Sequence, residues 1–138
     1  MRSRILGRWH GGAVIRRSGR LRDKTPGRAE EVIPEFVAWL EGLPGDHLVA
    51  VGAPAAVDFS FVNYYCHRFA GRNPLGYACL DLLSFAMGRL GASDYWELEY
   101  TLENALNVER DPMLEQHVAL DDAIQQARVL VALLTRAP

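Results

Sequence analysis

The sequence predicts an α/β fold, because two short apolar runs that resemble strands are each followed by a helical pattern. The runs cover residues 47–52 and 77–81, and glycine or proline lies beside each of them, as is typical of short buried strands. The chain has 138 residues, which suits one domain of ordinary size. We therefore expect the strands and helices to form one layered domain.

A helix is predicted from Glu30, with acidic residues near its N-terminal end, where the helix dipole favours negative charge. Gly42 and the Pro44-Gly45 pair end it. Its apolar residues recur at the spacing of one helical stripe: Val32, Ile33, Phe36, Val37 and Leu40. This helix precedes the first predicted strand.

The later elements follow the same alternation. A turn and a helix over 56–70 follow the first strand, and the second strand leads directly into a helix over 82–90 that ends at Gly91. Residues 94–116 show no clear period, although Asp94 occupies the position of a helix cap. A last helix over 120–134 has regular apolar spacing, formed by Leu120, Ala123, Ile124, Ala127, Val131 and Leu134.

Charge divides the chain into a basic segment, 1–28, and an acidic α/β domain, 29–138. The first carries nine basic residues and one acid, a formal charge of +8, while the second carries six basic residues and sixteen acids, a formal charge of -10. The Arg- and Gly-rich segment is interpreted either as containing a hairpin at 12–21 or as a disordered tail. The two predictions for this segment stay open.

Composition argues against several classes of protein. No stretch is long and apolar enough for a membrane helix, so we expect no membrane partner. Cys66 and Cys79 form no C-x-x-C pair and lie in apolar surroundings, which predicts two buried thiols. Because no disulfide framework is indicated, we expect a reducing, cytoplasmic location.

Three polar residues are candidates for chemistry: Asp58, His117 and Asp122. Asp58 follows the first predicted strand, at the carboxyl edge where α/β proteins gather their sites. His117 precedes Asp122 by five residues, so that a tight bend would let both face one cleft. Structural alternatives exist for each: an N-cap for Asp58, a favourable charge at a helix start for Asp122, and an ordinary loop residue for His117.

The segments that hold these residues resemble motifs of the DEDDh 3′–5′ exonucleases, such as ribonuclease T and the proofreading subunit of bacterial replicative polymerase. Residues 53–61 resemble the second motif of that family around Asp58, and residues 117–123 resemble the third motif, with its His and Asp five apart. Residues 80–86 resemble the strand-to-helix segment between the motifs. The resemblance covers roughly residues 30–136 and implies a ribonuclease H-like fold, a mixed sheet flanked by helices.

The resemblance also implies residue roles and a cofactor. In such enzymes four acids hold two divalent ions, Mg²⁺ or Mn²⁺, which prefer hard oxygen ligands. Asp58 and Asp122 would be metal ligands, and His117 would be the general base that deprotonates the attacking water. The implied partner is the 3′ end of single-stranded DNA or RNA, and a homodimer or a partner subunit is compatible with the resemblance.

One part of the family pattern is missing from the sequence. The first motif of the family is Asp-x-Glu on the first strand, and no Asp-x-Glu precedes Asp58. That strand would fall within residues 1–11, which contain no acid, so we expect a fold that is incomplete at its N-terminal strands. The expected protein is a truncated or degenerate 3′–5′ exonuclease with little or no activity and a doubtful two-metal site. The alternative is a non-catalytic module that binds nucleic acid or a protein partner.

Overall fold

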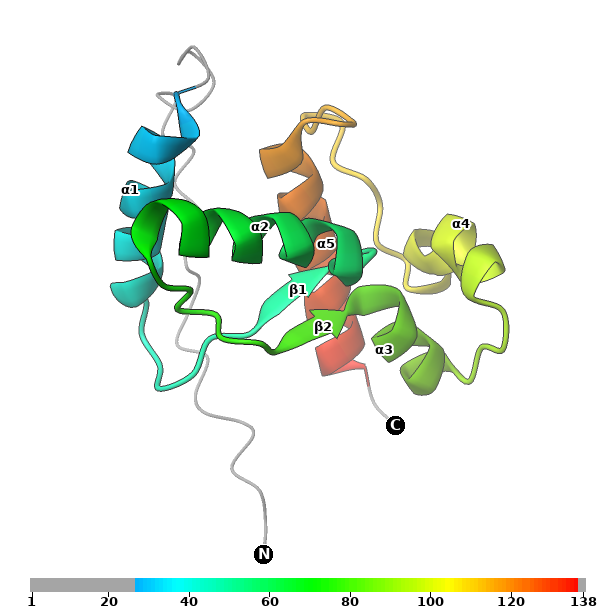
Figure 1. The fold of residues 1–138 in the computed structure, drawn as a ribbon. Helices are drawn as coiled ribbons and strands as arrows, with labels where there is room; N and C mark the ends of the chain where they lie inside the picture. Colours follow the sequence, from blue (N-terminus) through cyan, green and yellow to red (C-terminus); the bar gives the residue numbers. More distant parts are fainter. Residues whose placement is uncertain (1–26, 137–138) are drawn as a thin grey trace, which may run out of the picture.

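The computed structural model describes residues 27–136, which form a mostly helical α/β fold (Figure 1). The predicted hairpin at 12–21 and nearly all of the basic segment lie outside the described residues. Within the described part the elements are, in chain order, α1 Ala29–Glu41, β1 Ala50–Gly52, α2 Ala55–Ala70, β2 Cys79–Asp81, α3 Leu82–Leu90, α4 Tyr95–Ala105 and α5 Ala119–Thr135.

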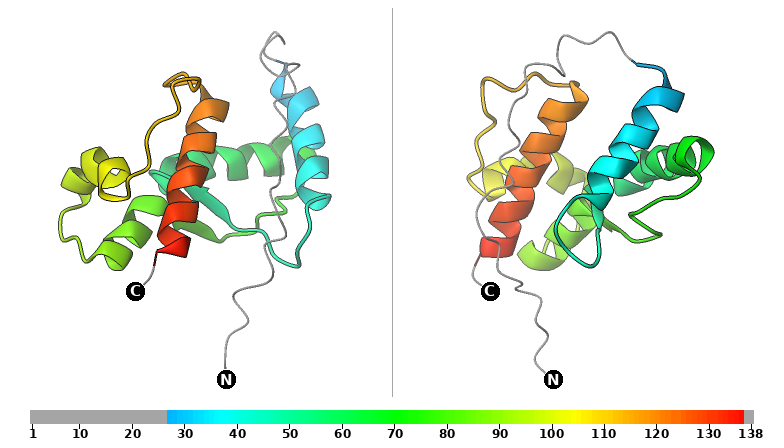
Figure 2. Two further views of the ribbon diagram at one scale, coloured as in Figure 1. Left: turned by 180° about the vertical axis from the view of Figure 1, so that it is seen from behind. Right: turned by 90° about the vertical axis from the view of Figure 1, so that its left-hand side faces the viewer.

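The two strands form a parallel pair at the centre of the fold. Ala50 pairs with Cys79, Val51 with Leu80, and Gly52 with Asp81, so the carboxyl ends of both strands lie at one edge. The helix α2 lies in front of this sheet in Figure 1, whereas α5 lies behind it, and the reversed view in Figure 2 agrees. The described sheet is therefore a thin layer between helices.

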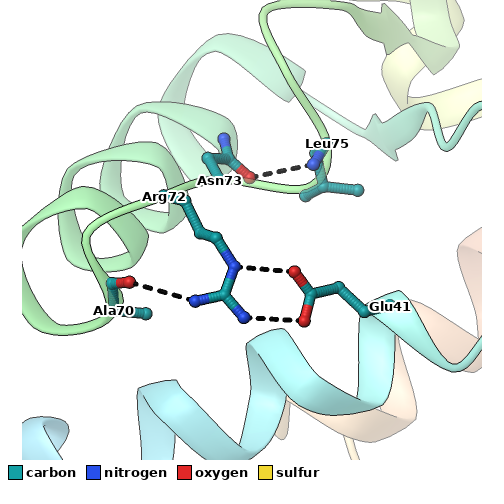
Figure 3. A network of polar contacts seen from close by, with 5 residues as sticks. All are labelled: Glu41, Ala70, Arg72, Asn73 and Leu75. Carbon is teal, nitrogen blue, oxygen red and sulfur yellow. Dashed lines mark hydrogen bonds and ion pairs between the residues drawn. The ribbon is translucent and has the colours of Figure 1, made fainter.

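The helix α1 packs against α2. An ion pair joins the end of α1 to the turn that follows α2. The guanidinium of Arg72, just after α2, donates two hydrogen bonds of 2.7 Å to the carboxylate of Glu41, the last residue of α1 (Figure 3). The hydrogen bonds from Arg72, with its positive charge, lower the pKa of Glu41. Because both side chains are well exposed, we expect salt to screen this contact and its contribution to stability to be small.

The main hydrophobic core lies where α3, α4 and α5 meet. Leu82, Leu83 and Ala86 of α3 point into it, and α4 and α5 close it with Leu98, Leu102, Val129 and Leu133. The ends of the helices are set by local chemistry: Asp94 accepts hydrogen bonds from the backbone N–H groups of Trp96 and Glu97, and Gly91 ends α3 in the left-handed conformation.

The strands differ most from the sequence prediction. Each is three residues long, shorter than predicted, and Val49 and Val51 are exposed because they line a cavity. The prediction of two buried thiols was wrong for Cys79: it lies exposed on β2, whereas Cys66 is fully buried in α2. Burial raises the pKa of the Cys66 thiol.

None of the helices that the structure describes is both long enough and apolar enough to cross a membrane.

Candidate functional site

The candidate site lies at the carboxyl edge of the two parallel strands. Gly52 ends β1 beside Asp81, which ends β2, and each strand is followed within a few residues by a helix. In α/β proteins this edge is the usual place for ligands, because the loops and the helix N-termini that follow parallel strands converge there. Four carboxylates are found near this edge or near the start of α5: Asp58, Asp81, Asp121 and Asp122.

Asp81 is the structural anchor of the edge. Its Oδ1 accepts a hydrogen bond from the backbone N–H of Ser84 at 2.8 Å and so caps α3, and its Oδ2 accepts one from the N–H of Ala55 at 3.0 Å. Burial acts to raise the pKa of Asp81, but hydrogen bonds from Ser84, Ala55 and Tyr95 outweigh it, so the pKa is lowered. One ionised side chain thus joins the end of β2 to the first residue of α2.

Asp58 lies in the first turn of α2 and is exposed. The alternative of an N-cap was wrong for this residue, because Pro54 occupies the cap position. A Cβ atom at Gly52 would lie 3.2 Å from the Cα of Ala55 and 3.4 Å from Oδ2 of Asp58. The absence of a side chain at Gly52 therefore lets α2 and its carboxylate approach the end of β1 closely.

Asp122 lies in the first turn of α5, where the helix dipole favours its charge, and both of its oxygens have partners. Its Oδ1 accepts a hydrogen bond from Arg110 Nη2 at 2.7 Å, and its Oδ2 accepts one from the backbone N–H of His117 at 3.1 Å. The neighbouring Asp121 is buried, and its Oδ2 accepts a hydrogen bond of 3.0 Å from the N–H of Glu115. The two aspartates together hold the preceding segment onto α5.

His117 is joined to Asp122 through its main chain. Its φ of 65° lies in the left-handed region, a conformation that few residues other than glycine adopt, and the bond to Asp122 helps to hold it. The side chain is exposed and is not among the residues that line the two cavities beside Asp122. The structure thus brings the backbone of His117, rather than its imidazole, to the aspartate.

Asp58 and Asp122 line one cavity of about 580 Å³. Its walls come from α1, β1, α2 and α5, and they are largely apolar, with Phe36, Trp39 and Val62 among them. The two aspartates, far apart in sequence, line the same cavity from α2 and α5. These two helices lie on opposite sides of the sheet (Figure 2). The motif spacing predicted a cleft shared by His117 and Asp122, whereas Asp122 shares this cavity with Asp58 and His117 does not line it.

The described residues do not fit a complete divalent-ion site. Carboxylate oxygens suit Mg²⁺ and Mn²⁺, but within residues 27–136 no group of three or more His, Cys, Asp or Glu side chains could hold a metal ion. In addition, both oxygens of Asp122 already accept hydrogen bonds within the fold.

Two residues of the site had no assigned role in the sequence prediction. Asp81 carries a local signal, because an aspartate directly before a helix, with Ser84 three residues later, is typical of an N-cap. Arg110 carries no such signal, because its partner is twelve residues away and the bend between them is not periodic. Only the folded chain shows that Arg110 and Asp122 meet.

The fold and the site define a class: an α/β protein with acidic side chains in a cavity at the carboxyl edge of parallel strands. No family model matches the chain. Over 101 residues, however, it is 36% identical to the 3′-5′ DNA exonuclease Cap18 of Escherichia coli, and the aligned part is 72% of this chain and 52% of Cap18. This similarity supports a relationship to the 3′–5′ exonuclease family. The chain spans about half the length of this relative.

Proposed function

We propose that the chain is a 3′–5′ exonuclease-like protein of the DEDDh type, with a ribonuclease H-like fold, that binds the 3′ ends of nucleic acid and cleaves them weakly or not at all. The observation that carries this proposal is the cavity shared by Asp58 and Asp122 in a relative of a 3′–5′ DNA exonuclease. The small parallel sheet between helices is compatible with part of a ribonuclease H-like fold.

The proposed roles follow the motifs. Asp58 and Asp122 occupy the positions of family metal ligands, and His117 occupies that of the general base. The expectation of weak cleavage is supported by the missing Asp-x-Glu before Asp58 and by the lack of a three-residue metal cluster among residues 27–136. A cytoplasmic location and a homodimer or partner subunit belong to the same proposal.

The activity part is tested with single-stranded DNA and RNA labelled at the 5′ end, incubated with the chain and Mg²⁺ or Mn²⁺. We expect trimming from the 3′ end to be no faster with the unmodified chain than with Asp58→Asn. Asp46→Asn is the matched control, because Asp46 is exposed in the turn between α1 and β1. Rapid trimming that is lost in Asp58→Asn and kept in Asp46→Asn would show that the chain is an active nuclease.

The binding part needs a different comparison, because a nucleic-acid end must be distinguished from the strand itself. We expect a linear single strand to compete for the chain better than a circular strand of the same length and sequence, which has no end. Equal competition by the two strands would favour the second candidate function, a module that binds phosphates through the basic segment 1–28. The formal charge of +8 on this segment predicts that such binding depends strongly on salt. Repeating the titration at several salt concentrations measures that dependence.

A further inference from the structure

We propose that Arg110 is a built-in counter-cation of Asp122, so that a divalent cation gains this carboxylate only by displacing the guanidinium. The inference rests on the proposed function in one respect, because that function gives Asp122 the position of a metal ligand. It assigns a role to Arg110, a residue outside the motif segments 53–61, 80–86 and 117–123. It adds to the lack of a three-residue acidic cluster in the described part of the chain a second obstacle to metal binding at Asp122.

The contact geometry supports this role. The Nη2 atom of Arg110 lies 2.7 Å from Oδ1 of Asp122, a distance typical of a charge-assisted hydrogen bond. Both side chains are about one-third exposed, at 34% for Arg110 and 33% for Asp122. The pair is therefore shielded from water in part, yet a small ion from solvent could still reach it.

The second oxygen of Asp122 is also occupied. Oδ2 accepts the backbone N–H of His117 at 3.1 Å, so an ion that bound both oxygens of the carboxylate would have to break two contacts. Because the guanidinium is tethered to the same chain, it competes for the carboxylate of Asp122 at a high effective concentration. A dissolved ion that binds there loses translational freedom and part of its hydration shell. With no cluster of further acidic ligands in the described part of the chain, the competition favours arginine.

The segment that carries Arg110 is held by other contacts as well. Asp111 forms an ion pair of 2.9 Å with Arg128 of α5, and the N–H of Glu115 bonds to Asp121. The side chain of Leu114 is buried, which fixes the same segment by packing. Replacing Arg110 alone should therefore free the carboxylate of Asp122 without releasing the segment.

The experiment measures binding of Mn²⁺ to the full chain, without nucleic acid, by the loss of the free-ion signal in electron paramagnetic resonance. We expect Arg110→Gln to bind Mn²⁺ about fivefold more tightly than the unmodified chain, the factor that corresponds to a partly exposed ion pair. In the double variant Arg110→Gln/Asp122→Asn, this increase in Mn²⁺ affinity should disappear. Arg128→Gln is the matched control, because it removes one positive charge and frees Asp111 rather than Asp122. Its Mn²⁺ affinity should rise less than that of Arg110→Gln and should not depend on Asp122.

Two results overturn the inference: Mn²⁺ affinity that does not rise in Arg110→Gln, or a rise that persists when Asp122 is also replaced. Arg110→Met, which keeps an apolar stem, is measured in parallel so that a folding defect in one variant does not decide the result. Circular dichroism checks that each variant is folded. Because no nucleic acid is present, the outcome is independent of whether the chain binds 3′ ends or cleaves them.

Discussion

Replacing Leu133 by alanine is expected to lower the free energy of unfolding by about 3 kcal/mol. Leu133 is fully buried, with 0% of its surface exposed, where α5 meets α3 and α4. Removing most of its side chain loses the transfer free energy of the buried atoms and leaves a cavity, which together cost about 2–5 kcal/mol for a leucine. Domains of this size are stable by only about 5–15 kcal/mol, so a large share of the folded-state stability would be lost.

The matched control for this prediction is the next residue. Leu134 is the same amino acid on the same helix turn, but 53% of its surface is exposed. We expect Leu134→Ala to change the free energy of unfolding by less than about 1 kcal/mol, since little apolar area is buried there. Urea denaturation followed by circular dichroism measures both variants. Similar losses in the two would contradict the position of the core.

Asp81→Ala is expected to lower the free energy of unfolding by about 2–4 kcal/mol. The variant loses the cap of α3, worth about 1 kcal/mol, and leaves the N–H of Ala55 without its acceptor, which costs a further 1–3 kcal/mol. Asp94→Ala is the comparison, because within the described part of the chain the hydrogen bonds that the side chain of Asp94 accepts all come from α4. The difference in urea stability between the variants reports the bond to Ala55, and equal losses would show that this bond contributes nothing.

The stabilisation by Asp81 should depend on pH. Because the pKa of Asp81 is lower in the folded chain than its ordinary value, the ionised form stabilises the fold above the unfolded pKa of about 3.9. That contribution is lost as the pH falls through the lower, folded pKa. We therefore expect the difference in unfolding free energy between the unmodified chain and Asp81→Ala to be full at pH 7 and to shrink below about pH 4. A difference that stays constant down to pH 2 would contradict the assignment.

Local sequence signals predicted where the helices lie, but not the buried face of α5, where Val131 and Leu134 of the predicted stripe are exposed. The apolar stripe before Gly42 and the glycine after Leu90 mark ends that agree with α1 and α3, and the cap position of Asp94 is confirmed by two hydrogen bonds. The burial of β1 and of Cys79 could not be predicted in the same way. An apolar run shows that a strand can be covered, but only the packing of distant elements decides whether Val51 and Cys79 are covered.

The candidate site was only partly predictable, because some of its contacts depend on the packing of distant elements. Motif spacing singled out Asp58 and Asp122, and both line one cavity, although their role as metal ligands stays a prediction. The ion pair with Arg110 depends on how the segment before α5 bends, including the left-handed residues Asn107 and His117, and no periodic pattern records such a bend. Contacts made by irregular backbone are therefore the part of a site that sequence patterns describe least.

One helix serves both the core and the site. Near its start, α5 carries Asp122, and its later turns supply Val129 and Leu133 to the main cluster. A molecule that binds the first turn of α5 more tightly in the folded than in the unfolded chain stabilises the whole cooperative unit. The melting temperature of that unit must therefore rise in proportion to the logarithm of the molecule's concentration. Thermal shift across a panel of oligonucleotides, nucleotides and divalent ions would thus identify ligands of this chain without any assay of turnover.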